Sequence, residues 1–416
     1  MGNRTAAQKS PKIQTEQTEQ SQHLITSTSF QSLKELPTSL SDPQCVLYKH
    51  ELLICGGIYQ RACYSYHTLK NEYKFICEYP IHIRLEGHCV VKLVDKNNKN
   101  SNQVTLLSFG GSNKHALAMK YVSVWNDISS NLNNCNQWVP FTNNRNHPII
   151  IGRYFDSYLG ARAVIGGSNN HLLFITYPRN NISVFDLNTF QFIQHDTLPT
   201  DNYIDYHCFI SNSENRQRKE MMKTNEEKNK QIYQMMLFCR FKGLSIEYNE
   251  DDNNFQFHQL NVCDDIGPLY RYAYVCTNNI ILFFGGCSQN GNVISKSVHK
   301  YSIQEDKWMT FQNALHSPLC DCAAILSEKD DHIHIIGGVN DKKITVSTHM
   351  KTKVCIWDSS LLVMMYFFIY FHETQINFIS KNDIKYIIQC WIRISKIKLG
   401  WIDDFDKIVT KYIRIK

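Results

Sequence analysis

The chain has 416 residues, of which 43% are hydrophobic, 20% charged and 12% aromatic, and its formal net charge is +6. This composition supplies enough apolar material for a sizeable core, and it excludes the disordered and fibrous classes for the chain as a whole. Lys and Arg are interspersed with Asp and Glu, so the sequence lacks the basic stripe that marks nucleic-acid-binding proteins, and we expect no nucleic-acid partner.

The cysteines and the start of the chain bear on the cellular compartment. The sequence contains fifteen cysteines, none of them in a C-x-x-C pair, and no apolar N-terminal segment of the kind that directs secretion. We therefore expect reduced cysteines that are mostly buried as small hydrophobic side chains, in a cytoplasmic protein.

The chain begins with a polar segment and continues with many short apolar runs. Residues 1–27 are rich in Gln, Thr, Ser and Lys and nearly free of apolar side chains, which predicts a disordered tail. Over residues 28–360, apolar runs of four to seven residues alternate with Asn, Gly, Asp and Lys clusters. This pattern predicts an all-β domain of short strands joined by turns.

Glycine pairs close four of the apolar runs and indicate a repeat. They are Gly56-Gly57, Gly110-Gly111, Gly285-Gly286 and Gly337-Gly338. The first two pairs are 54 residues apart and the last two 52 apart, and the intervening gap of 175 residues leaves room for two copies without the glycines. Apolar runs at 172–177 and 235–241 fit those two copies, so the sequence predicts six repeats rather than seven.

A second marker, a pair of aromatic residues, supports the same period. The two aromatics stand seven residues apart in four copies: Tyr66 and Tyr73, Phe185 and Phe192, Tyr248 and Phe255, Tyr301 and Trp308. In the second copy we assign Trp125 and Trp138 to these places, with an Asn-rich insertion between them.

Each repeat is predicted to be a four-stranded antiparallel meander, too small to bury its own faces. The glycines permit positive φ where the second strand ends, and the aromatics on the third and fourth strands fill the space between neighbouring sheets. Sheets stacked radially in a propeller bury each other and leave only short edges exposed.

An apolar run, Gly-Gly and then Tyr-x6-Trp at about fifty-residue spacing resembles the kelch repeat, most closely over residues 280–308. The resemblance implies a six-bladed kelch-type β-propeller over 28–360. Kelch proteins commonly act as adaptors for ubiquitin-ligase substrates or actin structures through an attached domain. The BTB and BACK helices of many such proteins are not recognisable here, because the repeats start near residue 30, and this puts a ligase role in doubt.

The last repeat is incomplete at its C-terminal end. After Gly337-Gly338 we assign residues 353–360, which include Trp357, as a third strand, and no aromatic fourth strand follows. Residues 29–36 precede the first repeat and resemble a fourth strand. We therefore predict that this N-terminal segment completes the last blade and closes the ring.

Three segments lie outside the repeat pattern. Residues 213–234 form a charged insertion, interpreted as a solvated hairpin extension or as a partner-binding arm. Residues 361–379 form an apolar insertion or linker, whose eleven-residue core 361–371 is shorter than the twenty or so residues of a spanning helix. It is interpreted as buried, as membrane-inserted or as foreign to the fold. Residues 380–416 show the periodicity of amphipathic helices that either dock on the propeller or recruit a partner.

The sequence contains no Walker loop, no G-x-S-x-G and no H-E-x-x-H. His332 and His334 could share one strand face as part of a metal site, but no third ligand is identifiable. We therefore assign no catalytic, metal or cofactor-binding residue, and expect a non-catalytic protein-binding adaptor. The alternatives are an enzyme or small-molecule-binding propeller, with polar groups converging on its channel, and a membrane-tethered scaffold that uses residues 361–371.

Overall fold

The computed structural model describes residues 29–94, 102–126, 135–201, 203–211, 232–277, 279–312, 314–327 and 329–358. The chain divides into two compact units, Ser29–Val354 and a second unit formed by Met1–Thr28 with Cys355–Lys416. The tail 1–27, the segment 361–379 and the helices expected over 380–416 lie outside the described residues. Among the described residues, no helix is long and apolar enough to cross a membrane.

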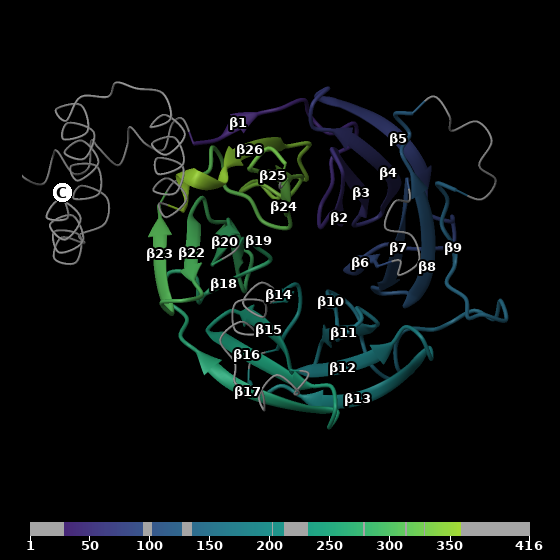
Figure 1. The fold of residues 1–416 in the computed structure, drawn as a ribbon. Helices are drawn as coiled ribbons and strands as arrows, with labels where there is room; N and C mark the ends of the chain where they lie inside the picture. Colours follow the sequence, from purple (N-terminus) through teal and green to yellow (C-terminus); the bar gives the residue numbers. More distant parts are fainter. Residues whose placement is uncertain are drawn as a thin grey trace, which may run out of the picture. The chain divides into compact units, whose positions relative to one another are not determined.

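The unit Ser29–Val354 is a β-propeller of six four-stranded antiparallel sheets around a central channel (Figure 1). Blade one contains β2 (Cys45–Tyr48), β3 (Glu51–Gly57), β4 (Gln60–His67) and β5 (Glu72–Glu78). Blade two contains β6 (His88–Leu93), β7 (Gln103–Gly110), β8 (His115–Val122) and β9 (Val139–Pro140). Blade three contains β10 (Arg162–Gly166), β11 (Leu172–Tyr177), β12 (Asn181–Asp186) and β13 (Gln191–Thr197).

The second half of the ring repeats the same order of strands. Blade four contains β14 (Cys208–Ser211), β15 (Ile232–Cys239), β16 (Lys242–Asn249) and β17 (Asn254–Leu260). Blade five contains β19 (Ala273–Thr277), β20 (Ile280–Phe284), β22 (Val298–Ser302) and β23 (Lys307–Phe311), with a small extra sheet of β18 (Leu269–Tyr270) and β21 (Cys287–Ser288) beside it. Blade six contains β24 (Ala323–Ser327), β25 (His332–Ile336), β26 (His349–Lys353) and β1 (Gln31–Ser32).

The apolar runs of the sequence form the second strand of each blade. Every residue of β3, β11 and β20 is buried, because these strands have a neighbouring sheet on both faces. The fourth strands β13 and β17 alternate between exposed and half-buried residues, since one of their faces meets solvent. The predicted insertion 213–234 is shorter than expected at its C-terminal end, because β15 begins at Ile232; residues 213–231 lie outside the described residues.

The hydrophobic core lies in layers between neighbouring sheets. Leu53 and Cys55 of β3 face blade two, whereas Leu52 and Ile54 of the same strand face blade six. This division follows from the period of two along a strand, which sends successive side chains to opposite faces. No blade therefore holds a complete core by itself, and each layer of the core depends on two neighbouring blades.

Closure follows the predicted arrangement of the chain ends. Strand β1 pairs with β26 through Gln31 opposite Lys351 and Ser32 opposite Met350, and the Leu33 amide donates to the His349 carbonyl oxygen at 2.8 Å. The prediction that residues 29–36 supply the fourth strand of the last blade is thus confirmed (Figure 1).

Leu36→Ala is expected to lower the free energy of unfolding by about 3 kcal/mol, because it empties a buried site in the closing segment. Leu36 is 5% exposed and packs in the cluster that contains Leu52 and Ile54 of blade one. Equilibrium unfolding in urea measures the effect. Lys34→Ala changes an exposed side chain two residues away and serves as the control. Equal stability of the two variants would contradict a role of this segment in closure.

Candidate functional site

The predicted glycine pairs lie where the second strand of a blade ends and its connection to the third strand begins. The first glycine of each pair has positive φ: Gly56 at 67°, Gly110 at 79°, Gly285 at 66° and Gly337 at 65°. Three of the second glycines also have positive φ: Gly111 at 73°, Gly286 at 101° and Gly338 at 115°. Gly57, the remaining one, pairs with Gln60 at the start of β4. These positions therefore set turn geometry.

The predicted aromatic pairs lie directly opposite each other on the third and fourth strands. Their ring centroids are 4.9 Å apart for Tyr66 and Tyr73, 5.1 Å for Phe185 and Phe192, 4.9 Å for Tyr248 and Phe255, and 5.0 Å for Tyr301 and Trp308. The seven-residue spacing is that of a tight hairpin whose two aromatics share one face. Tyr301 also contacts Phe238 of blade four at 4.9 Å, which fills the space between the sheets.

Three of these hairpins also contain a hydrogen bond that was not predicted from the sequence. The first tyrosine of the pair donates its hydroxyl to a turn residue five positions on, which has positive φ: Tyr66 to Asn71 at 2.8 Å, Tyr248 to Asn253 at 2.6 Å and Tyr301 to Asp306 at 2.9 Å. Asn and Asp tolerate this left-handed conformation better than most residues. The pattern Tyr-x4-Asn/Asp was the signal that could have revealed the turn.

The assignment of Trp125 and Trp138 to the second copy was wrong. Both residues lie outside β8 and β9 and pack against blade one, where Trp138 stacks on Tyr79 at 4.6 Å. In blade two, the place of the first aromatic is taken by Tyr121, which lies opposite Val104, the second residue of β7. The Asn-rich insertion separates the third and fourth strands here, so a spacing rule based on a tight hairpin could not apply.

The third strand of the last blade was also assigned too late in the chain. It is β26, His349–Lys353, and a 3-10 turn over Val354–Ile356 follows it. Trp357 therefore lies beyond the strand, although it is buried at 3% exposure. At the position of the first aromatic, this blade carries Thr352, opposite Ile333.

A ring of backbone hydrogen bonds encloses the central channel just before the first strands. One residue of each blade there has positive φ, and we call these six the central ring: Asp42, Gly87, Gly160, Tyr206, Arg271 and Asp321. Their amides donate to the carbonyl oxygen of the previous member at four places: Asp42 to Asp321, Asp321 to Arg271, Tyr206 to Gly160 and Gly160 to Gly87, at 2.7–2.9 Å. Four of the six members are not glycine, and such strain concentrates at functional or structurally essential positions.

The side chain of Tyr206 lies across the inside of the central ring. A Cβ on Gly160 would lie 2.7 Å from the Tyr206 ring, and a Cβ on Gly87 would lie 2.8 Å from its hydroxyl. The guanidinium groups of Arg271 and Arg162 stack on the same ring at 4.1 and 5.6 Å from its centroid. The two glycines are thus required because Tyr206, together with the Gly160 amide at 2.4 Å in the case of Gly87, occupies their side-chain space.

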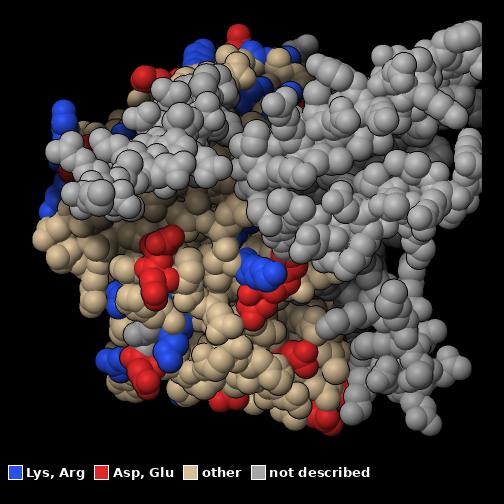
Figure 2. Space-filling model, turned by 90° about the vertical axis from the view of Figure 1, so that its left-hand side faces the viewer, with Lys and Arg blue, Asp and Glu red and all other residues tan. Residues whose placement is uncertain are grey.

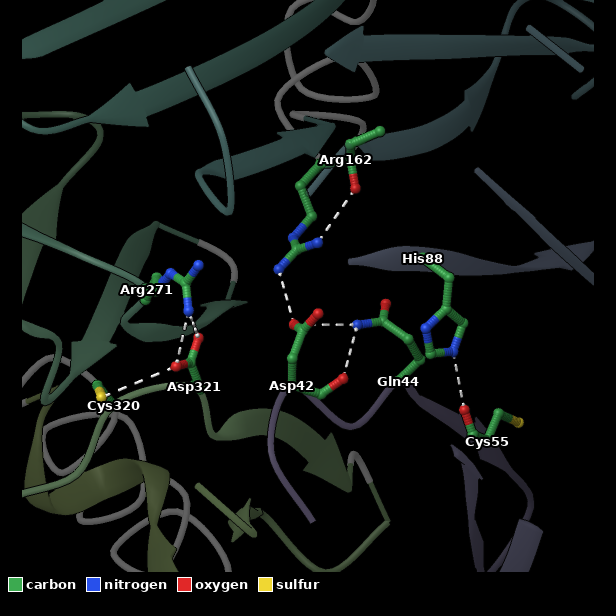
Figure 3. A network of polar contacts seen from close by, with 9 residues as sticks. Asp42, Gln44, Cys55, His88, Arg162, Arg271, Cys320 and Asp321 are labelled. Atoms are coloured by element: carbon green, nitrogen blue, oxygen red, sulfur yellow. Dashed lines mark hydrogen bonds and ion pairs between the residues drawn. The ribbon is translucent and has the colours of Figure 1, made fainter. Parts of the chain in front are cut away.

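Two ion pairs, one buried and one half-buried, connect blades around the channel (Figure 3). Arg162 of blade three donates to Asp42, ahead of blade one, at 3.1 Å, and both side chains are at most 14% exposed. Arg271 of blade five bonds both carboxylate oxygens of Asp321, ahead of blade six, at 3.1 and 3.3 Å. Gln44 lies beside Asp42 at 3.4 Å. The four charges cancel, so the ring is polar without net charge.

Burial dominates the protonation of the central carboxyls. It raises the pKa of Asp42 from 3.8 to about 6, although the Arg162 guanidinium opposes this shift. Burial likewise raises the pKa of Asp321, with Arg271 opposing. Burial works to lower the pKa of Arg162, but Asp42, Tyr274, Cys89 and Tyr206 together outweigh it and the pKa rises. Oδ2 of Asp42 and Nε of Arg271 are buried without a protein partner, so the ring keeps one acceptor and one donor free for water or a bound molecule.

The same end of the channel opens onto a face built by the 2–3 and 4–1 connections of the blades, which we call the loop face. Of the fifteen large hydrophobic residues that are exposed in the described part of the chain, nine belong to these connections: Tyr59, Ile81, Ile150, Tyr154, Phe155, Tyr203, Phe241, Val293 and Ile344. The connections of the opposite face contribute Leu69 and Val94. Among the described residues, the loop face therefore carries a group of exposed apolar side chains.

The connection between blades two and three carries the most exposed of these residues. Tyr154 and Phe155 are each 86% exposed, and their rings meet edge to face at 4.9 Å. The backbone beneath them is fixed, since Nζ of Lys114 donates to the carbonyl oxygens of Arg153 and Tyr154 at 3.1 and 2.6 Å. Two large aromatic side chains are thus exposed to solvent on a loop whose backbone is fixed by hydrogen bonds.

A cavity of about 270 Å³ lies on the loop face between blades one and two. Its lining consists of Tyr59, Arg61, Ile83, Arg84 and Leu85. Arg84 donates to the Tyr59 hydroxyl at 2.8 Å and stacks on its ring. This combination of aromatic, aliphatic and guanidinium groups suits the side chain of a bound protein.

Charged residues do not form a continuous field on the side of the molecule shown in Figure 2, where both signs occur in small separate groups. Within the described ranges, no group of three or more His, Cys, Asp or Glu residues is placed to hold a metal ion. His332 and His334 both belong to β25, and His334 bonds to His349 of β26.

Neither a protein-family model nor a curated protein matches the chain. Solved structures do match, among them one titled "Structure of YjhT", with a TM-score of 0.51 and 12% sequence identity over 76% of this chain and 95% of that chain. At this identity the likeness shows the fold alone. The chain is therefore a six-bladed β-propeller with a fold similar to that of YjhT.

Proposed function

We propose that this chain is a kelch-type, non-catalytic adaptor of the cytoplasm that binds a protein partner on its loop face. The observation that carries the proposal is the pair Tyr154 and Phe155, each 86% exposed on a loop that Lys114 fixes from below. Aromatic side chains that are ordered before binding lose little conformational entropy on association, which is why they dominate the energetics of protein interfaces.

The rest of the loop face supports the same function. Ile150 is 71% exposed on the same connection, and Ile81 is 85% exposed beside the cavity between blades one and two. A partner that spans these two regions could bury several apolar side chains around a polar, charge-balanced centre. Buried apolar anchors with polar groups around them are the usual composition of a protein interface.

A small-molecule site at the channel is the second candidate, favoured by the convergence of Asp42, Arg162, Arg271 and Asp321 on the central ring. Each of these charges already has a partner of opposite sign, and both guanidinium groups also lie against the Tyr206 ring. A ligand would have to displace these contacts, which is the reason we rank docking on the loop face first.

Phe155→Ser combined with Tyr154→Ser is expected to weaken partner binding at least thirtyfold, equivalent to about 2 kcal/mol for the loss of an aromatic anchor. Affinity purification of the full chain followed by quantitative mass spectrometry identifies the partner, and titration of the purified pair measures the dissociation constant.

Leu69→Ser is the matched control, since Leu69 is 68% exposed on the β4–β5 connection of the opposite face. The control should bind as the unchanged protein does, with the thermal midpoints of all variants compared to verify folding. Loss of binding in Leu69→Ser with retention in the loop variant would place the interface elsewhere. Retention in both, with loss in Arg271→Met, would favour the channel site.

A further inference from the structure

The interface between blades six and one, which we call the closure seam, contains a chain of hydrogen-bonded histidines. Nδ1 of His334 lies 2.9 Å from Nε2 of His349, and Nδ1 of His349 lies 2.5 Å from the Tyr73 hydroxyl of blade one. The Tyr66 ring packs edge-on against His349 at 4.4 Å and against His334 at 5.9 Å. Blade six thus contacts blade one through two imidazoles.

The hydrogen bond between His334 and His349 can form only when both histidines are neutral or when one of them is protonated. The short contact between the two imidazoles holds one hydrogen, carried by either nitrogen. If both rings were protonated, an N–H of His334 would face an N–H of His349 and the 2.9 Å contact would break.

The surroundings of the pair disfavour positive charge. Burial lowers the pKa of His334 to about 4, opposed by Asp330 and reinforced by Lys351 and His332. Burial also lowers the pKa of His349 well below its ordinary value, reinforced by His334 and Lys351. The titratable groups that face the pair from blade one are the phenols of Tyr66 and Tyr73, with the Cys45 thiol beside Tyr73.

The same strand that carries His349 also holds the N-terminal segment in place. Strand β26 pairs with β1 at Gln31 and Ser32, and the His349 carbonyl oxygen accepts the Leu33 amide at 2.8 Å. A displacement of His349 therefore acts directly on the short ladder that closes the ring. At the equivalent place in blade five, the third strand is followed by its own fourth strand, β23, through a four-residue turn.

We propose that the closure seam is an acid-sensitive latch, in which protonation of the pair His334 and His349 separates blade six from blade one and releases β1 from β26. The direction follows from linkage. Both histidines bind protons more weakly in the closed ring than in an opened seam, so closure is fully favoured above pH ~6.5 and weakens as the pH falls toward 4. Each histidine then contributes about tenfold per pH unit to the opening equilibrium.

Hydrogen exchange of the full chain, followed by mass spectrometry between pH 7 and pH 5, tests the latch. After correction for the intrinsic pH dependence of exchange, the peptide over residues 29–40 should lose at least tenfold in protection between pH 6.5 and pH 5. The peptide over β20 of blade five, Ile280–Phe284, should stay protected, because a local opening leaves that blade intact.

His334→Gln tests the assignment, since glutamine keeps polar groups at this place but does not titrate. It should reduce the pH dependence of the 29–40 peptide from the contribution of two histidines to that of His349 alone, about tenfold per pH unit. His299→Gln is the control, because burial lowers the pKa of His299 to about 4 in blade five, away from the seam. Loss of protection in both wild-type peptides together would mean general acid unfolding and would overturn the latch. If His334→Gln does not fold, the comparison of the 29–40 and Ile280–Phe284 peptides in the wild-type protein still distinguishes the latch from general acid unfolding.

Discussion

Replacing Gly285 with alanine is expected to lower the free energy of unfolding by about 4 kcal/mol, a large fraction of the stability of an ordinary domain. The added Cβ would lie 2.0 Å from the carbonyl oxygen of Leu319 and 3.0 Å from its carbonyl carbon. Both are backbone atoms of the segment that leads into blade six, so neither can rotate away. Gly285 also has φ of 66°, a conformation that adds roughly 1 kcal/mol of strain for alanine.

Gly291→Ala separates the two causes. Gly291 has nearly the same φ, 65°, and its added Cβ would meet no atom within 4 Å. This control should therefore lose only the conformational part, about 1 kcal/mol. Urea unfolding of both variants measures the difference, which reports the steric overlap with Leu319. Similar losses in the two variants would show that position 285 tolerates a side chain and that Leu319 can move.

Arg162→Met is expected to destabilise the protein by about 4 kcal/mol near pH 8, because it leaves the Asp42 carboxylate buried without its cation. Asp42 is 7% exposed in its side chain and already has a pKa near 6 in the presence of Arg162. Its folded-state pKa lies above the ordinary value, so its ionisation costs stability as the pH rises through 6. Without Arg162 that cost grows, and the destabilisation should shrink as the pH is lowered to 5.

Two comparisons make this result specific to the central ring. Asp42→Asn combined with Arg162→Met should be less destabilised at pH 8 than Arg162→Met alone, since no unpaired charge remains. Arg153→Met removes an arginine that is 54% exposed and pairs with Asp156 at 3.6 Å, and it should change stability by less than about 0.5 kcal/mol. A loss in Arg162→Met that is independent of pH would argue that Arg162 acts through packing alone.

The fold was predictable because its signals are local and repeated. The buried second strands appear as apolar runs, the hairpins fix the seven-residue spacing of pairs such as Tyr301 and Trp308, and the glycine pairs indicate positive φ at the turns. The closing strand was predictable from the number of strands in each repeat. The last repeat lacks a fourth strand and one strand precedes the first repeat, so in a closed ring the first strand of the chain completes the last blade. Where an insertion changed a hairpin, as between Trp125 and Trp138, the spacing rule failed.

The central ring could not be predicted from the same signals. Asp42, Arg162, Arg271 and Asp321 are single polar residues in unrelated loops, and the two ion pairs connect positions 120 and 50 residues apart. A comparison of the residues just before each first strand would have shown a polar or glycine residue in every blade. It would not have shown which ones meet.

The sequence by itself determined the six repeats, the four-stranded form of each and the use of both chain ends in the last blade, because the repeat signals are local and the last repeat lacks a strand. The tertiary structure decided which charges pair across the channel, which aromatic rings remain in water on the loop face and which histidines meet at the closure seam. These features depend on side chains from different blades, and their distances are set only when all six sheets close into a ring.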